Sequence, residues 1–343
     1  MSLSSPPHYL IASLGSIGKR HYRNLRALRP QAVITVLRRP ESEPVTTLGE
    51  EIAEVYSIEA ALALKPDAAI LAGPAPTHVA LAQRFAENGI PVFVEKPLSH
   101  DLVGLTALSR TANENGLAVM VAYNLRYNKA LVAVREQLLR GTIGNVLAVR
   151  AEVGQYLPDW RPDSNYRDGV SANKALGGGP LLELSHEIDF LYWIFGMPQR
   201  VSGVGGRFSD LDIDVEDCIE LCFEYDSPRR IISLHLDFLQ RPAARLCKFI
   251  GSIGTLTWDA LEDTFVVETV EPTLDRKVMR VPTDDRNQMY IDELSEFLAA
   301  VESRGDVSIP LSQGIDVMRI IDAAARSIAS GRTEAPKAFE DFL

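Results

Sequence analysis

HYLIASLGSIGKRH, residues 8–21, predicts how the first part of the chain folds. Its apolar start is typical of a short buried strand, and the residues from Gly18 onward are typical of a helix. Between them, SLGSIG at 13–18 lacks only the first glycine of the Gly-x-Gly-x-x-Gly fingerprint, because Ser13 stands there. Gly15 and Gly18 are the second and third glycines, which let a pyrophosphate approach the backbone and let the helix pack on the strand.

The same turn opens a helix N-terminus, where unpaired N–H groups and the helix dipole favour an anion. We therefore predict that Ser13, Gly15, Ser16, Ile17 and Gly18 bind the phosphates of a dinucleotide. A plain strand-to-helix turn in another kind of α/β protein is the alternative interpretation.

Strands and helices alternate over the first part of the chain. We predict strands at residues 8–13, 32–37, 67–73, 91–97 and 117–124. Repeated strand–helix–strand units require a parallel sheet with right-handed crossovers. The sequence therefore predicts an α/β protein whose N-terminal domain, residues 1–123, is a doubly wound Rossmann sheet.

The pattern changes after residue 123. Later segments alternate apolar and polar residues, at 200–208, 217–225, 230–238, 245–258 and 264–270. This alternation is typical of antiparallel strands with one covered face. Residues 124–343 are therefore predicted to form an α+β domain with a large, mostly antiparallel, open-faced sheet. Ser233, His235 and Asp237 fall on one side of their strand, so the open face is expected to be mixed rather than oily.

Composition excludes several kinds of partner. The formal net charge of -11 leaves no basic stripe for nucleic acid or for an anionic membrane surface. No apolar run reaches the ~20 residues that span a bilayer, and the N-terminus does not predict a signal peptide. Three cysteines, Cys218, Cys222 and Cys247, form neither a disulfide framework nor a metal-ligand spacing, so we expect structural thiols in a reducing cytoplasm.

Two arginines follow the second predicted strand. In VITVLRRP, residues 33–40, Arg38 and Arg39 stand near the point where NAD-preferring proteins usually carry an acid for the ribose hydroxyls. An acid would repel a 2′-phosphate, whereas a guanidinium can bind it through paired hydrogen bonds. The sequence therefore favours NADP over NAD. Two arginines that only solubilise a loop are the alternative.

VFVEKPLS, residues 92–99, carries a charged pair at the carboxyl end of a strand. Ligands of open α/β sheets bind outside that end. Lys96 there can orient a substrate hydroxyl and lower its pKa, and both Lys96 and Glu95 beside it are predicted to line the cofactor site. A solvated surface pair is the alternative.

In combination, these segments resemble the Gfo/Idh/MocA oxidoreductases, the family of glucose-fructose oxidoreductase and inositol dehydrogenase. The resemblance rests on the order of SLGSIGKRH, GPAPTHVALAQRFAENGIPVFVEKPLS, VAYNLRYNKAL and GGGPLLELSHEIDFLYWIFG, and it covers almost the whole chain. It implies a Rossmann domain, a C-terminal open-faced sheet domain, and NAD or NADP chemistry on a hydroxyl or carbonyl of a sugar or cyclitol.

The resemblance also assigns roles. Lys96 matches the family's catalytic lysine, and Pro97 is expected to follow a cis bond. His186, followed by Asp189, matches the His-x-x-Asp segment that supplies the acid/base histidine. The family often has an Asp before that histidine with three residues between them. Here Glu183 stands before it with only two residues between them, which departs from the pattern. Residues 180–196 are predicted to form one helix, on which Glu183 and His186 are one turn apart and could share a face, so we include Glu183 as a candidate.

Pro76, Thr77 and His78 match a segment that passes near the nicotinamide ribose, so Pro76 and His78 are predicted to contact the cofactor. Substrate contacts are expected from the second domain and from the junction before it. The candidates are Asn124, Arg126, Tyr156, Trp160, Arg161, Tyr166 and His186. Aromatic faces suit sugar rings, and Arg and Asn suit hydroxyls or a carboxylate.

These residues predict hydride transfer between the nicotinamide and a carbinol carbon of a sugar, sugar acid or cyclitol. His186 would take the hydroxyl proton, because histidine titrates near pH ~6.5, and Lys96 would stabilise the developing negative charge. A nicotinoprotein with tightly bound cofactor and a non-catalytic dinucleotide-sensing regulator are the alternatives. We also expect a homodimer or homotetramer formed through the C-terminal sheet.

Overall fold

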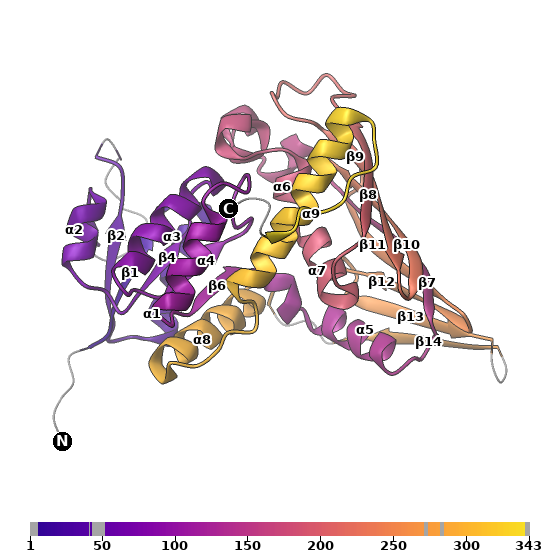
Figure 1. The fold of residues 1–343 in the computed structure, drawn as a ribbon, viewed down its shortest axis with the longest axis horizontal. Helices are drawn as coiled ribbons and strands as arrows, with labels where there is room; N and C mark the ends of the chain where they lie inside the picture. The colour runs from indigo at the N-terminus through magenta and orange to yellow at the C-terminus, as the bar shows by residue number, and fades with distance from the viewer. Residues whose placement is uncertain (1–5, 41, 43–51, 271–273, 282–284, 340–343) are drawn as a thin grey trace. The chain divides into compact units, whose positions relative to one another are not determined.

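The computed structural model describes residues 6–40, 42, 52–270, 274–281 and 285–339 (Figure 1). Its chain divides into two compact units. The first takes the described residues up to Asn124 together with Asn287–Ile315, and the second takes Leu125–Arg286 and the described residues from Asp316 onward. This differs from the single predicted boundary at 123/124. The 287–315 segment returns to the first unit because its helix packs on the first helix of the chain.

The first unit is built on a parallel sheet. Its strands are β1 (His8–Ala12), β2 (Val33–Leu37), β3 (Ala53–Val55), β4 (Ala68–Leu71), β5 (Val92–Glu95) and β6 (Val119–Ala122). They lie in the order β3-β2-β1-β4-β5-β6, and every pair is parallel. β4, β5 and β6 are buried at every residue, as expected for strands covered on both faces. The predicted doubly wound sheet is confirmed.

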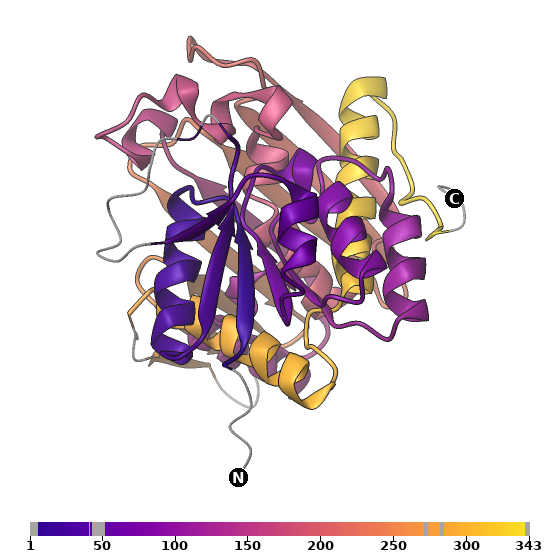
Figure 2. The same cartoon turned by 90° about the vertical axis from the view of Figure 1, so that its left-hand side faces the viewer.

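Helices cover the two faces of this sheet. They are α1 (Ser16–Leu28), α2 (Ile58–Ala63), α3 (His78–Glu87), α4 (Leu105–Glu114) and α8 (Gln288–Ser303). α1 packs on α8, and α3 packs on α4, and these two pairs lie on opposite faces of the sheet (Figure 2). Ser57 caps α2, because its hydroxyl accepts a hydrogen bond from the Ala60 N–H.

The second unit is built on a larger sheet. Its strands are β7 (Val146–Gly154), β8 (Arg200–Gly206), β9 (Cys218–Asp226), β10 (Arg229–Asp237), β11 (Ala244–Gly251), β12 (Gly254–Asp259), β13 (Thr264–Thr269) and β14 (Asp275–Arg280). The order is β14-β13-β12-β11-β7-β10-β9-β8. β7 and β10 are parallel, and the other neighbours are antiparallel, which confirms the predicted mostly antiparallel sheet.

One face of this larger sheet is covered by helices. They are α5 (Lys129–Leu139), α6 (Pro180–Glu183), α7 (His186–Phe195) and the part of α9 (Leu311–Ser330) that starts at Asp316 (Figure 1). The sheet's other face carries half-buried and exposed side chains, and the three cysteines are free thiols. In the part of the chain that the structure describes, no helix is both long and apolar enough to cross a membrane.

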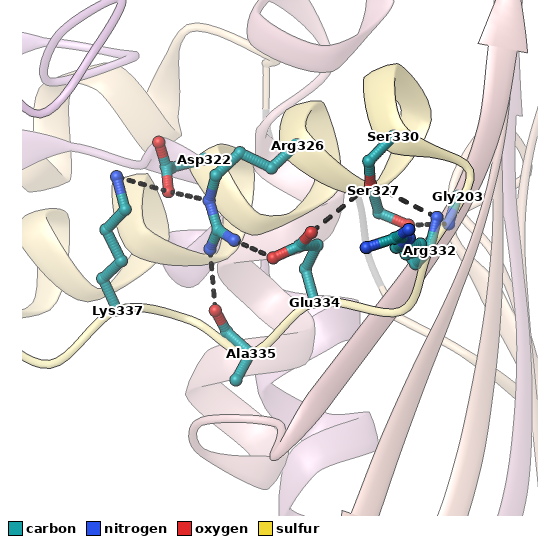
Figure 3. Close-up of polar contacts among 9 residues, drawn as sticks. All are labelled: Gly203, Asp322, Arg326, Ser327, Ser330, Arg332, Glu334, Ala335 and Lys337. Atoms are coloured by element: carbon teal, nitrogen blue, oxygen red, sulfur yellow. Dashed lines mark hydrogen bonds and ion pairs between the residues drawn. The ribbon is translucent and has the colours of Figure 1, made fainter.

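The segment after α9 folds back along the helix and covers the edge of β8. The backbones of Glu334 and Val201 exchange two hydrogen bonds, at 2.7 and 2.9 Å. Arg326 pairs with both Asp322 and Glu334, and the Ser327 hydroxyl accepts a bond from the Gly203 N–H (Figure 3). An unpaired sheet edge invites pairing with other chains, so this segment protects β8.

Candidate functional site

The turn at residues 13–18 gives each position the role that the fingerprint requires. Ser13 adopts φ = 82°, in the left-handed region that glycine occupies easily, and its N–H donates to the Leu37 carbonyl at 3.0 Å. A Cβ added at Gly18 would lie 2.2 Å from the Ser13 carbonyl oxygen, so only glycine permits this helix–strand packing. A Cβ added at Gly15 would meet no atom of the described residues within 4 Å, which leaves the backbone open to a ligand.

This turn also presents an uncapped helix end. Gly15 is the N-cap of α1, no described side chain caps the helix, and its first turn holds no acid. The first N–H groups of a helix have no acceptor within the helix. Those of Ser16, Ile17 and Gly18 therefore make this end of α1 favourable for an anion. The open backbone at Gly15, the uncapped end and the close approach at Gly18 fit the pyrophosphate of a dinucleotide.

Arg38 and Arg39 differ in their surroundings. Arg38 is half-buried, and its Nη1 donates to Glu54 Oε1 at 2.7 Å. The Tyr56 hydroxyl donates to Glu54 Oε2 at 2.7 Å, and this hydrogen bond, more than Arg38, holds the Glu54 pKa below its usual range. Arg39 is exposed. The sequence did not single out Glu54, because only the pairing of Leu37 with Val55 brings β3 beside the end of β2.

Glu95, Lys96 and Pro97 follow the buried strand β5. A cis peptide joins Lys96 to Pro97, as the resemblance predicted. Glu95 is 6% exposed, its Oε2 accepts the Lys96 backbone N–H at 3.1 Å, and its Oε1 lies 2.6 Å from His21 Nε2. Glu95 is therefore bound to protein groups rather than turned toward solvent. The Lys96 side chain is half-buried at the carboxyl end of the sheet.

His78 is buried, and both of its ring nitrogens have protein partners. It is 1% exposed, with Nδ1 2.9 Å from the Pro97 carbonyl and Nε2 2.9 Å from the Gly73 carbonyl. Burial lowers its pKa, so the neutral ring can donate only one of these two hydrogen bonds. Both ring nitrogens lie near backbone oxygens, so His78 braces the loop after Lys96, and its contact with the cofactor stays a prediction. Pro76, in the short helix Ala75–Thr77, is half-buried at the surface.

In the second unit, His186 begins α7. The predicted continuous helix is broken, because α6 ends at Glu183 and α7 starts at His186. Glu183 accepts a hydrogen bond from the Ser171 hydroxyl at 2.7 Å, so its carboxylate has a protein partner. Glu183 and His186 therefore do not share the face of one helix. His186 is half-buried at the start of α7.

Arg126 and Asp189 form a buried pair. Arg126 donates from Nε and Nη2 to the two carboxylate oxygens of Asp189 at 3.0 and 2.6 Å, and their side chains are 4% and 0% exposed. Burial raises the pKa of Asp189 to about 6, against the opposing effect of Arg126. The Arg126 guanidinium lies in this pair and 5.9 Å from the Trp193 ring. The structure therefore places Arg126 in the core of the unit, where it anchors α7.

The long polar loop of residues 155–179 folds into four short 3₁₀ turns. Trp160 packs edge-on against Phe238 at 5.2 Å, and its indole N–H donates to the Gln155 carbonyl. The Tyr166 hydroxyl accepts the Asp212 N–H at 3.2 Å.

The remaining substrate candidates lie in three different settings. The ring of Tyr156 lies 3.2 Å under the Arg241 guanidinium. Arg161 is exposed. Asn124 is 4% exposed and belongs to the first unit, where it hydrogen-bonds Tyr290.

Comparisons with known proteins agree with this fold. The model of the GFO/IDH/MocA oxidoreductase family with NAD-binding Rossmann fold matches residues 8–123, and that of the GFO/IDH/MocA C-terminal domain matches 131–257. Inositol 2-dehydrogenase of Rhizobium meliloti (strain 1021) is 24% identical over 331 residues, which are 93% of this chain and 96% of that protein.

Two further proteins extend the comparison. D-xylose 1-dehydrogenase (NADP(+)) 2 of Haloferax volcanii is 24% identical over 267 residues, 77% of this chain and 79% of that protein. The solved structure of levoglucosan dehydrogenase with NADH and levoglucosan has a TM-score of 0.86 at 18% identity, covering 97% of this chain and 100% of that one. The chain belongs to the GFO/IDH/MocA family of oxidoreductases, with an NAD-binding Rossmann fold at its N-terminus.

Proposed function

We propose that the protein is an NAD(P)-dependent dehydrogenase or reductase that acts on a CH–OH group of a sugar, sugar acid or cyclitol. The observation that carries the proposal is the turn at residues 13–18. Its open backbone at Gly15 and uncapped helix end suit a dinucleotide, and Lys96 follows a strand of the same sheet at its carboxyl end. The named relatives act on inositol and xylose, which supports the substrate class.

The reaction assigns different tasks to the two units. When bound, the nicotinamide supplies or accepts the hydride. Lys96 would donate a hydrogen bond to the substrate oxygen and stabilise its negative charge, and His186 would accept the hydroxyl proton during oxidation. The Lys96 backbone is held by the Glu95 carboxylate, which supports a fixed position for this residue.

For the cofactor, we propose a preference for NADP that depends on Arg39. Arg38 pairs with Glu54, so the positive charge of Arg38 is balanced by a carboxylate near the expected ribose position. Arg39 is exposed and next to it. Either arginine could donate a hydrogen bond to a 2′-phosphate. Among the described residues, a carboxylate balances the charge of Arg38 and no ion pair is seen for Arg39.

The test is the Lys96→Ala variant, assayed with a panel of sugars, sugar acids and cyclitols and with both cofactors. We expect turnover to fall by roughly 10²–10⁴-fold while the cofactor Kd stays within about threefold. Lys277→Ala, at an exposed position on β14, is the matched control and should behave as wild type. Full turnover in Lys96→Ala would show that the catalytic assignment is wrong. Cofactor that copurifies and resists dilution would indicate a nicotinoprotein.

We also propose that the open face of the larger sheet joins two or more copies of the chain. It combines cations at Arg150 and Lys248 with anions at Glu152 and Glu220, a mixture that can pair with itself across a two-fold axis. His235 on this face hydrogen-bonds Asp237, which raises its pKa to about 9. Light scattering on the purified protein tests the proposal, and a monomer at micromolar concentration would contradict it.

A further inference from the structure

His21 is a buried polar side chain that the proposed mechanism does not use. It lies on α1, one turn after Gly18, and its ring is 0% exposed. Leu25, four residues further along the same face of α1, is also 0% exposed, so apolar side chains can pack there. Burying a polar ring costs free energy unless it is hydrogen-bonded, so the partner of His21 indicates what the residue does.

The partner of His21 is the carboxylate of Glu95. Nε2 of His21 lies 2.6 Å from Glu95 Oε1, and Glu95 is 6% exposed at the end of the buried strand β5. An ionised carboxylate accepts hydrogen bonds and cannot donate them, so Nε2 carries the proton and donates. Nδ1 of His21 is buried without a hydrogen-bond partner in the described part of the chain. A ring whose single proton is on Nε2 therefore leaves no ring N–H group unpaired.

Two aromatic rings fix the orientation of the His21 ring. Phe93 stands edge-on to it with the ring centroids 5.3 Å apart, and Tyr290 of α8 stands edge-on to it at 6.4 Å. Phe93 and Glu95 are two residues apart on β5, so they lie on the same face of the sheet. His21 therefore contacts β5 at both residues, and a turn of the ring away from Glu95 would also disturb its aromatic contacts.

The second oxygen of Glu95 holds the backbone of Lys96. Oε2 accepts the Lys96 N–H at 3.1 Å, so each carboxylate oxygen has a donor. On the other side of Lys96, the Pro97 carbonyl lies 2.9 Å from His78 Nδ1. The backbone is thus held both before and after Lys96. This constraint matters for catalysis, because a displacement of ~1 Å at a reacting group can lower the rate by roughly 10²-fold.

We propose that His21 is a positioning residue for Lys96, an inference that rests on the proposed dehydrogenase function. The Nε2–H of His21 binds the Glu95 carboxylate, and this carboxylate binds the Lys96 N–H. α1 begins within the turn at residues 13–18, so the bridge joins the helix proposed to bind the cofactor phosphates to the lysine proposed to bind the substrate oxygen. No proton is transferred along the bridge, because each one stays on its donor.

The first test measures the bridge without catalysis. Lys96 is the only lysine of the chain that follows a glutamate, so labelling with carbonyl-¹³C glutamate and ¹⁵N lysine isolates its amide signal in NMR spectra. In the cofactor-free protein we expect this amide to exchange with deuterium roughly tenfold faster in His21→Phe, which keeps a ring without a donor. His21→Gln, whose amide can donate in place of Nε2, should exchange at the wild-type rate. An unchanged rate in His21→Phe would overturn the proposal.

Leu25→Val is the matched control, because it shortens another buried side chain of α1 and leaves the His21 bond in place. It should lower the stability of the protein without changing the exchange rate of the Lys96 amide. Acceleration equal to that in His21→Phe would overturn the proposal, because a looser helix would then explain both variants.

Nitrogen NMR of wild type gives a further result that does not need His21→Phe to fold. The His21 signal is assigned by its loss in His21→Gln, and we expect a proton on Nε2. A ring protonated on Nδ1 alone would overturn the proposal.

The second test measures turnover. In His21→Phe we expect kcat to fall roughly tenfold while the cofactor Kd stays within about threefold, because the turn at residues 13–18 is intact. His21→Gln should keep kcat within about threefold of wild type, and Leu25→Val should match wild type. His21→Phe combined with Glu95→Gln should be as slow as the slower single variant, because both substitutions remove the same bridge.

The outcomes separate the positioning role from the proposed function. Full kcat in His21→Phe, or effects that multiply in the double variant, would overturn the positioning role. Turnover that survives in Lys96→Ala would instead refute the proposed function, and the exchange rate of the Lys96 amide would then still decide whether His21 holds this backbone.

Discussion

The turn at residues 13–18 and the loop at 155–179 were both predicted to bind ligands. In the folded chain they differ in whether their polar groups already have protein partners. The turn leaves its backbone open at Gly15 and its helix end uncapped. In the loop, Trp160 and Tyr166 are already bonded to backbone groups of the second unit. A backbone motif therefore keeps its ligand-binding groups available, whereas polar side chains in a long loop often form hydrogen bonds that stabilise the fold.

The largest expected effect concerns Arg126, a predicted substrate residue whose guanidinium forms a buried ion pair with Asp189. Asp189→Asn removes the partner of a buried guanidinium, so the free energy of unfolding should fall by roughly 3–5 kcal/mol, measured by denaturant titration. The double variant Arg126→Met/Asp189→Leu should recover most of this loss, because no buried charge remains. If Asp189→Asn were as stable as wild type and only raised KM, Arg126 would be a substrate ligand after all.

Substitutions at two glycines of the turn separate its effect on stability from its effect on cofactor binding. Gly18→Ala puts a Cβ against the Ser13 carbonyl and should cost about 1–3 kcal/mol of stability. The Cβ of Gly15→Ala would have no neighbour within 4 Å in the part of the chain that the structure describes, so stability should change by less than about 1 kcal/mol while the cofactor Kd rises by roughly tenfold or more. Thermal unfolding and cofactor titration of both variants check this. Equal cofactor affinity in Gly15→Ala would contradict a phosphate site at this turn.

The distance along the chain between interacting residues explains which features could be predicted from the sequence. The fingerprint and the cis bond before Pro97 depend on neighbours within a few positions, so they could be predicted from the sequence. Partners such as Glu54 for Arg38 and Tyr290 for His21 come from distant segments, and only the register of β3 and the return of α8 bring them together. The pattern of α7 suggested a longer helix, because the apolar spacing of residues 180–195 continues through the break before His186.

Cofactor choice gives a smaller effect. Glu54→Gln removes a negative charge near the expected 2′-phosphate and frees Arg38, so the ratio of kcat/KM for NADP over NAD should rise about tenfold. Arg39→Ala should lower the same ratio by a similar factor. Steady-state kinetics with both cofactors measure it, and Glu59→Gln, an exposed acid on α2, is the control. A ratio that falls in Glu54→Gln would mean that Glu54 orients Arg38 for the phosphate.

The smallest effect is at Ser13. Its positive φ strains any residue with a Cβ, so Ser13→Gly should raise stability by about 0.5–1 kcal/mol after the entropy of glycine is subtracted. Ser13→Ala keeps the Cβ and should bring no such gain. Chemical denaturation of the three proteins decides between relief of strain and loss of the hydroxyl, since a gain in both variants would implicate the hydroxyl.

The dinucleotide site at residues 13–18 is best tested by titrating the wild-type protein with NADP and with NAD, followed by tryptophan or nicotinamide fluorescence. We expect saturable binding of NADP at micromolar concentration and weaker binding of NAD. Failure of both cofactors to bind would contradict the dinucleotide site at residues 13–18, and with it the proposed dehydrogenase function.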